Sequence, residues 1–180
     1  MTIIHPPIVR TLFLPDEAAT QALAQCLAQK REITNAFVAL HGNLGAGKTT
    51  FVRFLLQTLG VKGRIKSPTY AVVEPYVLPD VNIWHFDFYR FTDPREWEEA
   101  GFRDIFASHG LKIAEWTEKV GDLLPTPDVT IFLDIDTNRQ NNVARTVTIR
   151  VHTRTGEALM NAIEITDNRV VATQPVELTL

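Results

Sequence analysis

The stretch Gly42-Asn43-Leu44-Gly45-Ala46-Gly47-Lys48-Thr49 decides the fold that we expect for this chain. It matches the phosphate-loop pattern G-x-x-x-x-G-K-[ST]. Residues 36–40 before it form a short apolar run typical of a strand, and residues 49–59 after it form a helical pattern that Gly60 ends. A strand, a glycine-rich loop and a helix in this order predict a site for a nucleoside triphosphate. The structural alternative is a glycine-rich turn ahead of a buried helix.

The residue types in this loop suit the binding of phosphate. Without a Cβ, the loop glycines let the backbone turn tightly and come close to a polyphosphate. Successive backbone N–H groups then point at the anion, and the start of the helix adds its partial positive charge. Lys48 is expected to reach the β- and γ-phosphates, and the Thr49 hydroxyl is expected to be a ligand of Mg²⁺. The loop residues predicted to bind the nucleotide are Asn43, Leu44, Gly45, Ala46, Gly47, Lys48, Thr49 and Thr50.

Composition limits the class of protein. The 180 residues are enough for one α/β domain, and 45% hydrophobic with 22% charged residues is ordinary for a globular chain. No stretch is long and apolar enough to span a bilayer, and residues 1–7 lack the features of a signal peptide. The single cysteine, Cys26, excludes an internal disulfide and fits a reducing cytoplasm. We therefore expect a cytoplasmic protein with no membrane partner.

Charge argues against a protein that holds nucleic acid by itself. The formal net charge is −3, whereas such proteins usually carry a basic face. Residues 62–66 form the one local basic cluster, Lys-Gly-Arg-Ile-Lys, and a solvated loop is the structural alternative for it. We expect no DNA partner, and any contact with another nucleic acid to be indirect, through a partner protein.

A helix is predicted ahead of the phosphate-loop strand, from residue 16 to residue 27. Asp16 is a suitable N-cap, and Ala19, Leu23, Cys26 and Leu27 fall on one face. In many nucleotide-binding domains an N-terminal segment closes over the base. On that ground Glu17, at the start of this helix, is counted among the predicted nucleotide-binding residues.

Two further predicted strands each end at an acidic residue. Residues 81–87 form a largely apolar run that ends at Asp87, and residues 111–114 form another that is followed by Glu115 and Trp116. Because the carboxyl ends of parallel strands meet at the edge where ligands bind, both acids are expected at one edge of the sheet. Either acid can serve Mg²⁺ or instead be a partner in a structural salt bridge. Trp116 can be a pocket residue or a core aromatic.

These elements predict an α/β fold: a P-loop NTPase-like three-layer sandwich with a mostly parallel central sheet and helices on both faces. Residues 67–70, Ser-Pro-Thr-Tyr, are either a switch loop or an ordinary turn. The alternation of apolar and polar residues over 145–151 predicts a solvated face or an edge strand. The other expected elements are strands at 71–73 and 128–135 and helices at 94–99 and 155–162. We divide the chain into a P-loop ATPase domain, residues 1–155, and a C-terminal helix and loosely attached tail, residues 156–180.

Together the motifs resemble the bacterial TsaE (also YjeE) family of ATPases. The resemblance covers roughly residues 10–150. It is carried by the phosphate loop and by residues 66–70 (KSPTY), 73–76 (VEPY), 85–90 (HFDFYR), 101–106 (GFRDIF) and 115–116 (EW). The chain departs from the family pattern at Asn43, where Asp is usual, and at Phe88, where Leu is common.

The resemblance implies an ATPase that uses ATP and Mg²⁺ and serves tRNA modification. The TsaE family acts with the TsaD and TsaB proteins, which install threonylcarbamoyl on the adenosine beside the anticodon, and ATP hydrolysis resets that complex. Residues matching Thr49 and Glu115 serve Mg²⁺, the one matching Asp87 lies at the phosphates, and the one matching Trp116 lies beside the nucleotide. We accordingly predict Lys48, Asp87 and Glu115 as catalytic and Thr49 and Glu115 as metal ligands.

Two other functions remain open at this stage. A small-molecule kinase uses the same loop but needs an acceptor pocket and usually an arginine-rich lid, and the chain is short of both. A nucleotide-dependent binding module would hold ATP only to order residues 67–70.

The sequence does not fix an arginine finger. Arg90 and Arg103 are the nearest candidates for one, with a surface salt bridge as the alternative for each. We therefore expect slow hydrolysis by the chain alone and stimulation by its partners.

Overall fold

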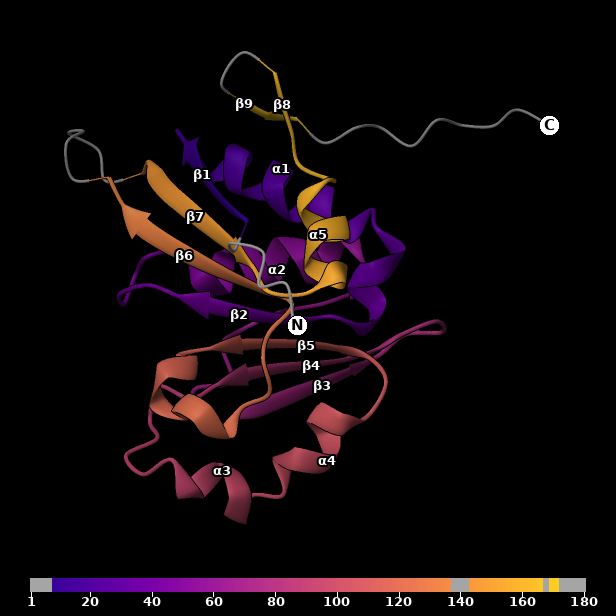
Figure 1. Ribbon diagram of the computed structural model, residues 1–180, viewed down its shortest axis with the longest axis vertical. Coiled ribbons are helices and arrows are strands. Elements are labelled where there is room, and N and C mark those ends of the chain that lie inside the picture. Colours follow the sequence, from indigo (N-terminus) through magenta and orange to yellow (C-terminus); the bar gives the residue numbers. More distant parts are fainter. Residues whose placement is uncertain (1–7, 137–142, 167–168, 172–180) are drawn as a thin grey trace, which may run out of the picture.

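The computed structural model describes residues 8–136, 143–166 and 169–171. Within these residues a seven-stranded sheet has the order β1-β7-β6-β2-β5-β4-β3 (Figure 1). Its four central strands, β6, β2, β5 and β4, are parallel, and the outer pairs are antiparallel. The strands are β1 (Val9–Leu14), β2 (Phe37–His41), β3 (Val73–Val77), β4 (Asn82–Asp87), β5 (Leu111–Glu115), β6 (Val129–Ile135) and β7 (Arg145–Val151).

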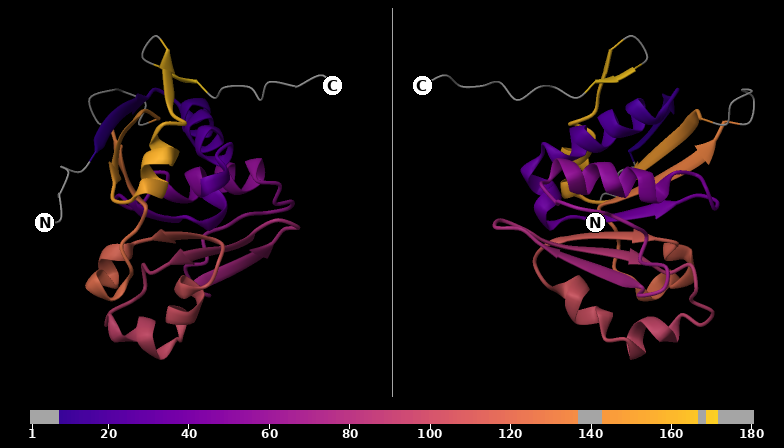
Figure 2. Two further views of the ribbon diagram at one scale, coloured as in Figure 1. Left: turned by 45° about the vertical axis from the view of Figure 1, so that its right-hand side comes forward. Right: turned by 180° about the vertical axis from the view of Figure 1, so that it is seen from behind.

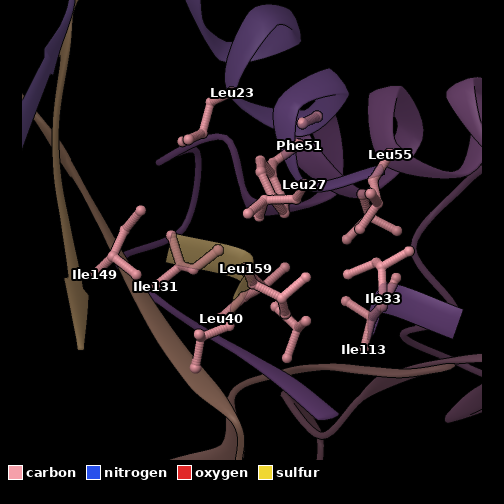
Figure 3. Packing of buried hydrophobic residues seen from close by; sticks show 14 of the residues in the cluster. Leu23, Leu27, Ile33, Leu40, Phe51, Leu55, Ile113, Ile131, Ile149 and Leu159 are labelled. Carbon is pink, nitrogen blue, oxygen red and sulfur yellow. The ribbon is translucent and has the colours of Figure 1, made fainter. Parts of the chain in front are cut away.

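Helices cover both faces of this sheet, as Figure 2 shows. On one face lie α1 (Glu17–Ala28), α2 (Lys48–Thr58) and α5 (Arg154–Met160), which share a core of aliphatic side chains with the sheet (Figure 3). On the other face lie α3 (Arg95–Glu99) and α4 (Phe102–Ala107), over an aromatic cluster. The predicted three-layer α/β sandwich is therefore confirmed.

Capping and spacing explain the first two helices. Asp16 Oδ1 accepts a hydrogen bond from Ala19 N at 2.8 Å, which satisfies one of the free N–H groups at the start of α1. Leu23 and Leu27 of α1 then lie four residues apart on its buried face. Phe51 and Leu55 repeat that spacing on α2, so both helices turn an apolar stripe to the sheet (Figure 3).

Other elements differ from the sequence-based expectation. The strand expected at 71–73 begins only at Val73, because Val72 has a φ of 67° and cannot continue an extended strand. Strand β7 is not an edge strand, since β1, which the sequence pattern did not predict, pairs with its outer side. The alternation along β7 instead reflects a solvated face, where Arg150 is exposed.

After α5, two short strands that we did not predict pair in an antiparallel sheet of their own. It consists of β8 (Glu164–Thr166) and β9 (Arg169–Val171), and β9 lies against α1 and β1 (Figure 1). Helix α5 itself begins one residue before the predicted start, and its Leu159 is buried in the same aliphatic core as α2. In the described part of the chain no helix is long and apolar enough to cross a membrane.

A substitution in α5 tests whether this helix is docked on the sheet as described. Gly156 is buried, and a Cβ there would overlap the carbonyl oxygen of Asp128. We expect Gly156→Ala to lower the free energy of unfolding by about 1–3 kcal/mol through overpacking, although Ala is ordinarily the better helix former. The measurement is urea denaturation, with Glu157→Ala on the exposed side of α5 as the control. A neutral or stabilising Gly156→Ala would mean that α5 is not packed in this way.

Candidate functional site

The carboxyl ends of three parallel strands form the candidate site. The phosphate loop follows β2, Asp87 ends β4 and Glu115 ends β5, and the last two residues are partners in the β4–β5 register. They line a cavity of about 280 Å³. Its wall consists of Leu44, Gly45, Gly47, Lys48, Thr49, Thr50, Ser67, Thr69, Asp87, Tyr89, Glu115 and Trp116. The predicted meeting of the two acids at one sheet edge is thus what the structure shows.

The loop needs glycine at two of its positions. Gly42 has a φ of 141°, and a Cβ there would overlap the carbonyl oxygen of Leu133 on the neighbouring strand β6. Gly47 has a φ of 106° and directly precedes α2 as its N-cap. Both conformations are easy for glycine and costly for other residues. They bring the loop back over the sheet edge, with the N-terminus of α2 beside the cavity.

Lys48 is held inside the loop. The residue is 4% exposed, and Nζ donates to the carbonyl oxygens of Gly42 at 2.6 Å and Asn43 at 3.1 Å. Nζ also lies 4.1 Å from the ring centroid of Trp116. Burial lowers the pKa of Lys48, and the nearby carboxylates, among them Glu115, oppose that effect. Lys48 lines the cavity, so its amine can exchange these carbonyl contacts for a phosphate oxygen.

Glu115 is the most constrained acid in the site. Thr49 Oγ1 donates to its carboxylate at 2.9 Å, and His85 Nε2 lies 2.9 Å from its Oε1. Because an ionised carboxylate only accepts hydrogen bonds, Nε2 is the protonated nitrogen of His85. Glu115 and His85 are 2% and 0% exposed, so His85 is fully buried and Glu115 reaches only the wall of the cavity. Among the described residues His85 Nδ1 has no hydrogen-bond partner.

The hydroxyl of Thr49 and the carboxylate of Glu115 are the donors that suit Mg²⁺. Both are hard oxygen ligands, they are in contact, and they face the cavity. No cluster of three or more His, Cys, Asp or Glu that could hold a metal occurs in the described part of the chain. A Mg²⁺ ion here would therefore complete its coordination with phosphate oxygens and water, which is its usual behaviour in nucleotide sites.

Asp87 is engaged differently, by the segment that precedes β3. Its Oδ2 accepts from Thr69 Oγ1 at 2.7 Å and from Ser67 Oγ, and its Oδ1 accepts from Tyr89 N at 2.9 Å. Its backbone N–H donates to the carbonyl oxygen of Val72, which with Trp116 is one of two described non-glycine residues that have a positive φ. Asp87 therefore fastens residues 67–72 to the cavity. Such strain in a β-branched residue beside a site is typical of functional segments.

The remaining predicted residues fall around this cavity or outside it. Trp116 lies on the cavity wall, beside Tyr89 with 5.0 Å between ring centroids. Glu17 lines a neighbouring cavity of about 190 Å³, which shares Gly47 and Thr50 with the first. Asn43 is exposed on the loop. Ala46 is buried under the loop and lines the neighbouring cavity. Their contacts with nucleotide stay predictions.

Two arginines proposed from the sequence are placed on the surface. Arg103 forms an ion pair with Glu98 at 2.9 Å, which is the surface salt bridge given above as the alternative to an arginine finger. The Arg90 guanidinium stacks on the exposed ring of Tyr70 at 4.1 Å. Neither lines the cavity.

Sequence reasoning missed two side chains that support the site. One is His85, whose contact with Glu115 depends on the neighbouring positions of β4 and β5. The other is Arg145 of β7, whose Nε donates to the carbonyl oxygen of Ala46 at 2.7 Å and braces the loop from outside. His85 had a local signal, two residues before Asp87 on the same strand face. Arg145 had none, because 99 residues separate it from the loop.

Fold and site together place the chain among α/β proteins with a P-loop-like fold. A crystal structure of Bacillus subtilis YdiB superposes with a TM-score of 0.70 over 87% of this chain and 95% of that chain, at 21% identity. That likeness concerns the fold alone.

The family follows from the sequence comparisons. The family model described as "Threonylcarbamoyl adenosine biosynthesis protein TsaE" matches residues 14–147. A protein of Haemophilus influenzae named "tRNA threonylcarbamoyladenosine biosynthesis protein TsaE" is 36% identical over 156 residues, covering 84% of this chain and 96% of that protein. A Bacillus subtilis protein of the same name is 34% identical over 99 residues, 53% of this chain and 60% of its own length. The chain belongs to the TsaE family, and the resemblance inferred from its motifs is confirmed.

The contact between His85 and Glu115 has a measurable consequence for stability. We expect His85→Phe to lower the free energy of unfolding by about 1–3 kcal/mol, because a buried carboxylate loses one of its two side-chain partners. The measurement is urea denaturation, with His109→Phe, an exposed position, as the control. In a Glu115→Gln background the loss should shrink, because the uncharged amide needs the partner less. An equal loss in both backgrounds would contradict the proposed contact.

Proposed function

We propose that this chain binds Mg²⁺-ATP in the cavity between the phosphate loop, Asp87 and Glu115 and hydrolyses it slowly. We further propose that the TsaD–TsaB complex stimulates hydrolysis, and that the cycle supports threonylcarbamoylation of the adenosine next to the anticodon of tRNA. Membership of the TsaE family supports the pathway. The observation that carries the ATPase proposal is the contact of Thr49 with the buried carboxylate of Glu115, beside Lys48.

The chain's own residues account for binding and charge neutralisation. Lys48 Nζ would exchange its two loop carbonyls for the β- and γ-phosphate oxygens. The loop N–H groups and the start of α2 would bind the same phosphates. Thr49 and Glu115 would hold the metal ion, which when bound neutralises the developing charge. Asp87 would orient an attacking water. Alternatively, loss of the γ-phosphate would change the hydrogen bonds by which Asp87 holds residues 67–72.

The proposed dependence on partners follows from what the cavity lacks. No arginine is among the described residues that line it. An arginine finger contributes roughly 10³ to 10⁵ in rate in related phosphoryl transfers. A chain without one should turn over slowly by itself, and a partner that inserts a cation at the cavity mouth would accelerate the reaction. ATP is favoured over GTP because the sequence lacks the guanine-recognition motif Asn/Thr-Lys-x-Asp.

Trp116 provides a direct signal for nucleotide binding. Its ring lies on the cavity wall against Lys48 Nζ, so entry of a triphosphate should displace the amine and change the indole fluorescence. We expect a saturable change on adding ATP with Mg²⁺ that is lost in Trp116→Phe, while Trp84 and Trp97 are left in place. Binding confirmed by calorimetry without any change in fluorescence would remove Trp116 from the nucleotide pocket.

Reconstitution of the tRNA modification tests the proposed function as a whole. We expect the purified TsaD–TsaB system to complete multiple turnovers only with this chain and ATP, and to stop early with a non-hydrolysable analogue. Glu115→Gln should bind ATP yet lower turnover at least about 100-fold, since it weakens the metal site and transition-state neutralisation. Glu99→Gln, an exposed position outside the cavity, is the control. Full activity with the analogue would instead favour a nucleotide-dependent binding module.

A further inference from the structure

A second hollow, next to the nucleotide cavity, is lined by cations. It measures about 470 Å³ and lies between α2 and the loop of residues 62–67. Its charged side chains are Arg53 of α2 and Arg64 and Lys66 of the loop. It shares Thr49 and Ser67 with the nucleotide cavity, so the two hollows adjoin. We call it the cationic groove.

The loop that carries these cations is anchored to the protein core. Val61 and Ile65 are 6% and 3% exposed and belong to the aliphatic core below α2. Between and after them, Lys62, Arg64 and Lys66 are exposed. Buried aliphatic residues and exposed cations therefore alternate along this loop. The buried residues hold the loop, and with it the positive charges, in place beside α2.

These cations have no ion-pair partner within the described part of the chain. None of the ion pairs formed by the described residues includes Arg53, Arg64 or Lys66. The nearest acids of the site are already engaged, Asp87 by hydroxyls and Glu115 by Thr49 and His85. Clustered like charges repel one another, although the whole chain carries a net charge of −3. An anionic ligand would relieve that repulsion.

The other groups that line the groove favour a phosphodiester over an acidic protein segment. They are mainly polar residues: Gln57, Thr49 and Ser67. The one aliphatic side chain among them, Ile65, is buried. Protein interfaces usually offer apolar anchors at their centre, whereas phosphate backbones are held by arginine, lysine, amides and hydroxyls.

An exposed aromatic residue lies close to the groove in sequence. Tyr70, three residues after Ser67, is 86% exposed, and the guanidinium of Arg90 stacks on its ring at 4.1 Å. Exposed aromatic rings beside a cationic surface are the means by which proteins stack unpaired bases. Neither ring nor guanidinium is needed by the nucleotide cavity, since neither residue lines it.

We propose that the cationic groove binds the phosphate backbone of single-stranded or looped RNA, and that Tyr70, three residues after Ser67, stacks on an unpaired base. This goes beyond the proposed ATPase, because the chain would contact RNA directly, next to the nucleotide cavity. It also replaces the expectation of purely indirect contact that the net charge favoured. Binding does not require ATP hydrolysis, so the two proposals can fail separately.

The test is fluorescence anisotropy of the full-length chain with a fluorescein-labelled RNA anticodon stem-loop. We expect a dissociation constant of about 10⁻⁶ to 10⁻⁴ M at physiological salt, and a plot of log K against log[salt] with a slope near −2, about −0.7 for each of three cations. The triple variant Arg53→Gln, Arg64→Gln, Lys66→Gln should bind at least about 10-fold more weakly, with a slope close to zero. Tyr70→Ala should weaken binding while leaving the slope unchanged.

The control removes the same total charge elsewhere, through Arg31→Gln, Lys119→Gln and Arg154→Gln, all exposed positions. This variant should retain RNA binding, and both triple variants should keep the Trp116 response to ATP. No binding of the RNA, or an equal loss in the two triple variants, would overturn the proposal. So would a polyglutamate peptide that binds as tightly as RNA, because the groove would then be a protein-docking surface. Loss of the ATP response with RNA binding intact would show that the groove belongs to the nucleotide site.

Discussion

The buried carboxylate of Glu115 is the constraint on which the site depends. A charge that is 2% exposed is tolerable only with hydrogen-bond donors around it, and Thr49 and His85 supply them. Thr49 belongs to α2, and His85 belongs to β4. One carboxylate thus joins the phosphate-loop helix, β5 and β4 at the sheet edge. It also holds the Thr49 hydroxyl at its side, and these are the two oxygen ligands that we propose for Mg²⁺.

The second acid has a different partner and so a different role. Asp87 lies next to Glu115 in the sheet, yet its oxygens are held by the hydroxyls of residues 67 and 69 and by the N–H of Tyr89. A ligand that competes for Asp87 would release this segment, and one that leaves it in place would keep the segment closed. We therefore propose different roles for the neighbouring carboxylates: Glu115 would bind the metal ion, and Asp87 would make residues 67–72 respond to nucleotide. The same segment borders the cationic groove, so nucleotide state and RNA contact would be coupled through residues 67–70.

How far the sequence predicts this arrangement depends on the range of each signal. The phosphate loop is local, since its glycines, Lys48 and the flanking strand and helix lie within 25 residues, and its geometry followed the pattern. Asp87 and Glu115 met at one edge because parallel strands align their carboxyl ends. His85, Arg145 and β1 were missed because their partners depend on strand order, which a single sequence does not contain. Strand β3 was misplaced because Val72 adopts a φ that no local rule assigns to valine.

The most direct test of this account is a crystal structure of the chain with a non-hydrolysable ATP analogue and Mn²⁺, whose anomalous scattering locates the metal. The account predicts an anomalous peak at coordination distance from Thr49 Oγ1 and beside Glu115, directly or through one water, with the triphosphate against the N–H groups of residues 43–49. A peak on Asp87 alone, or a nucleotide outside this loop, would contradict it.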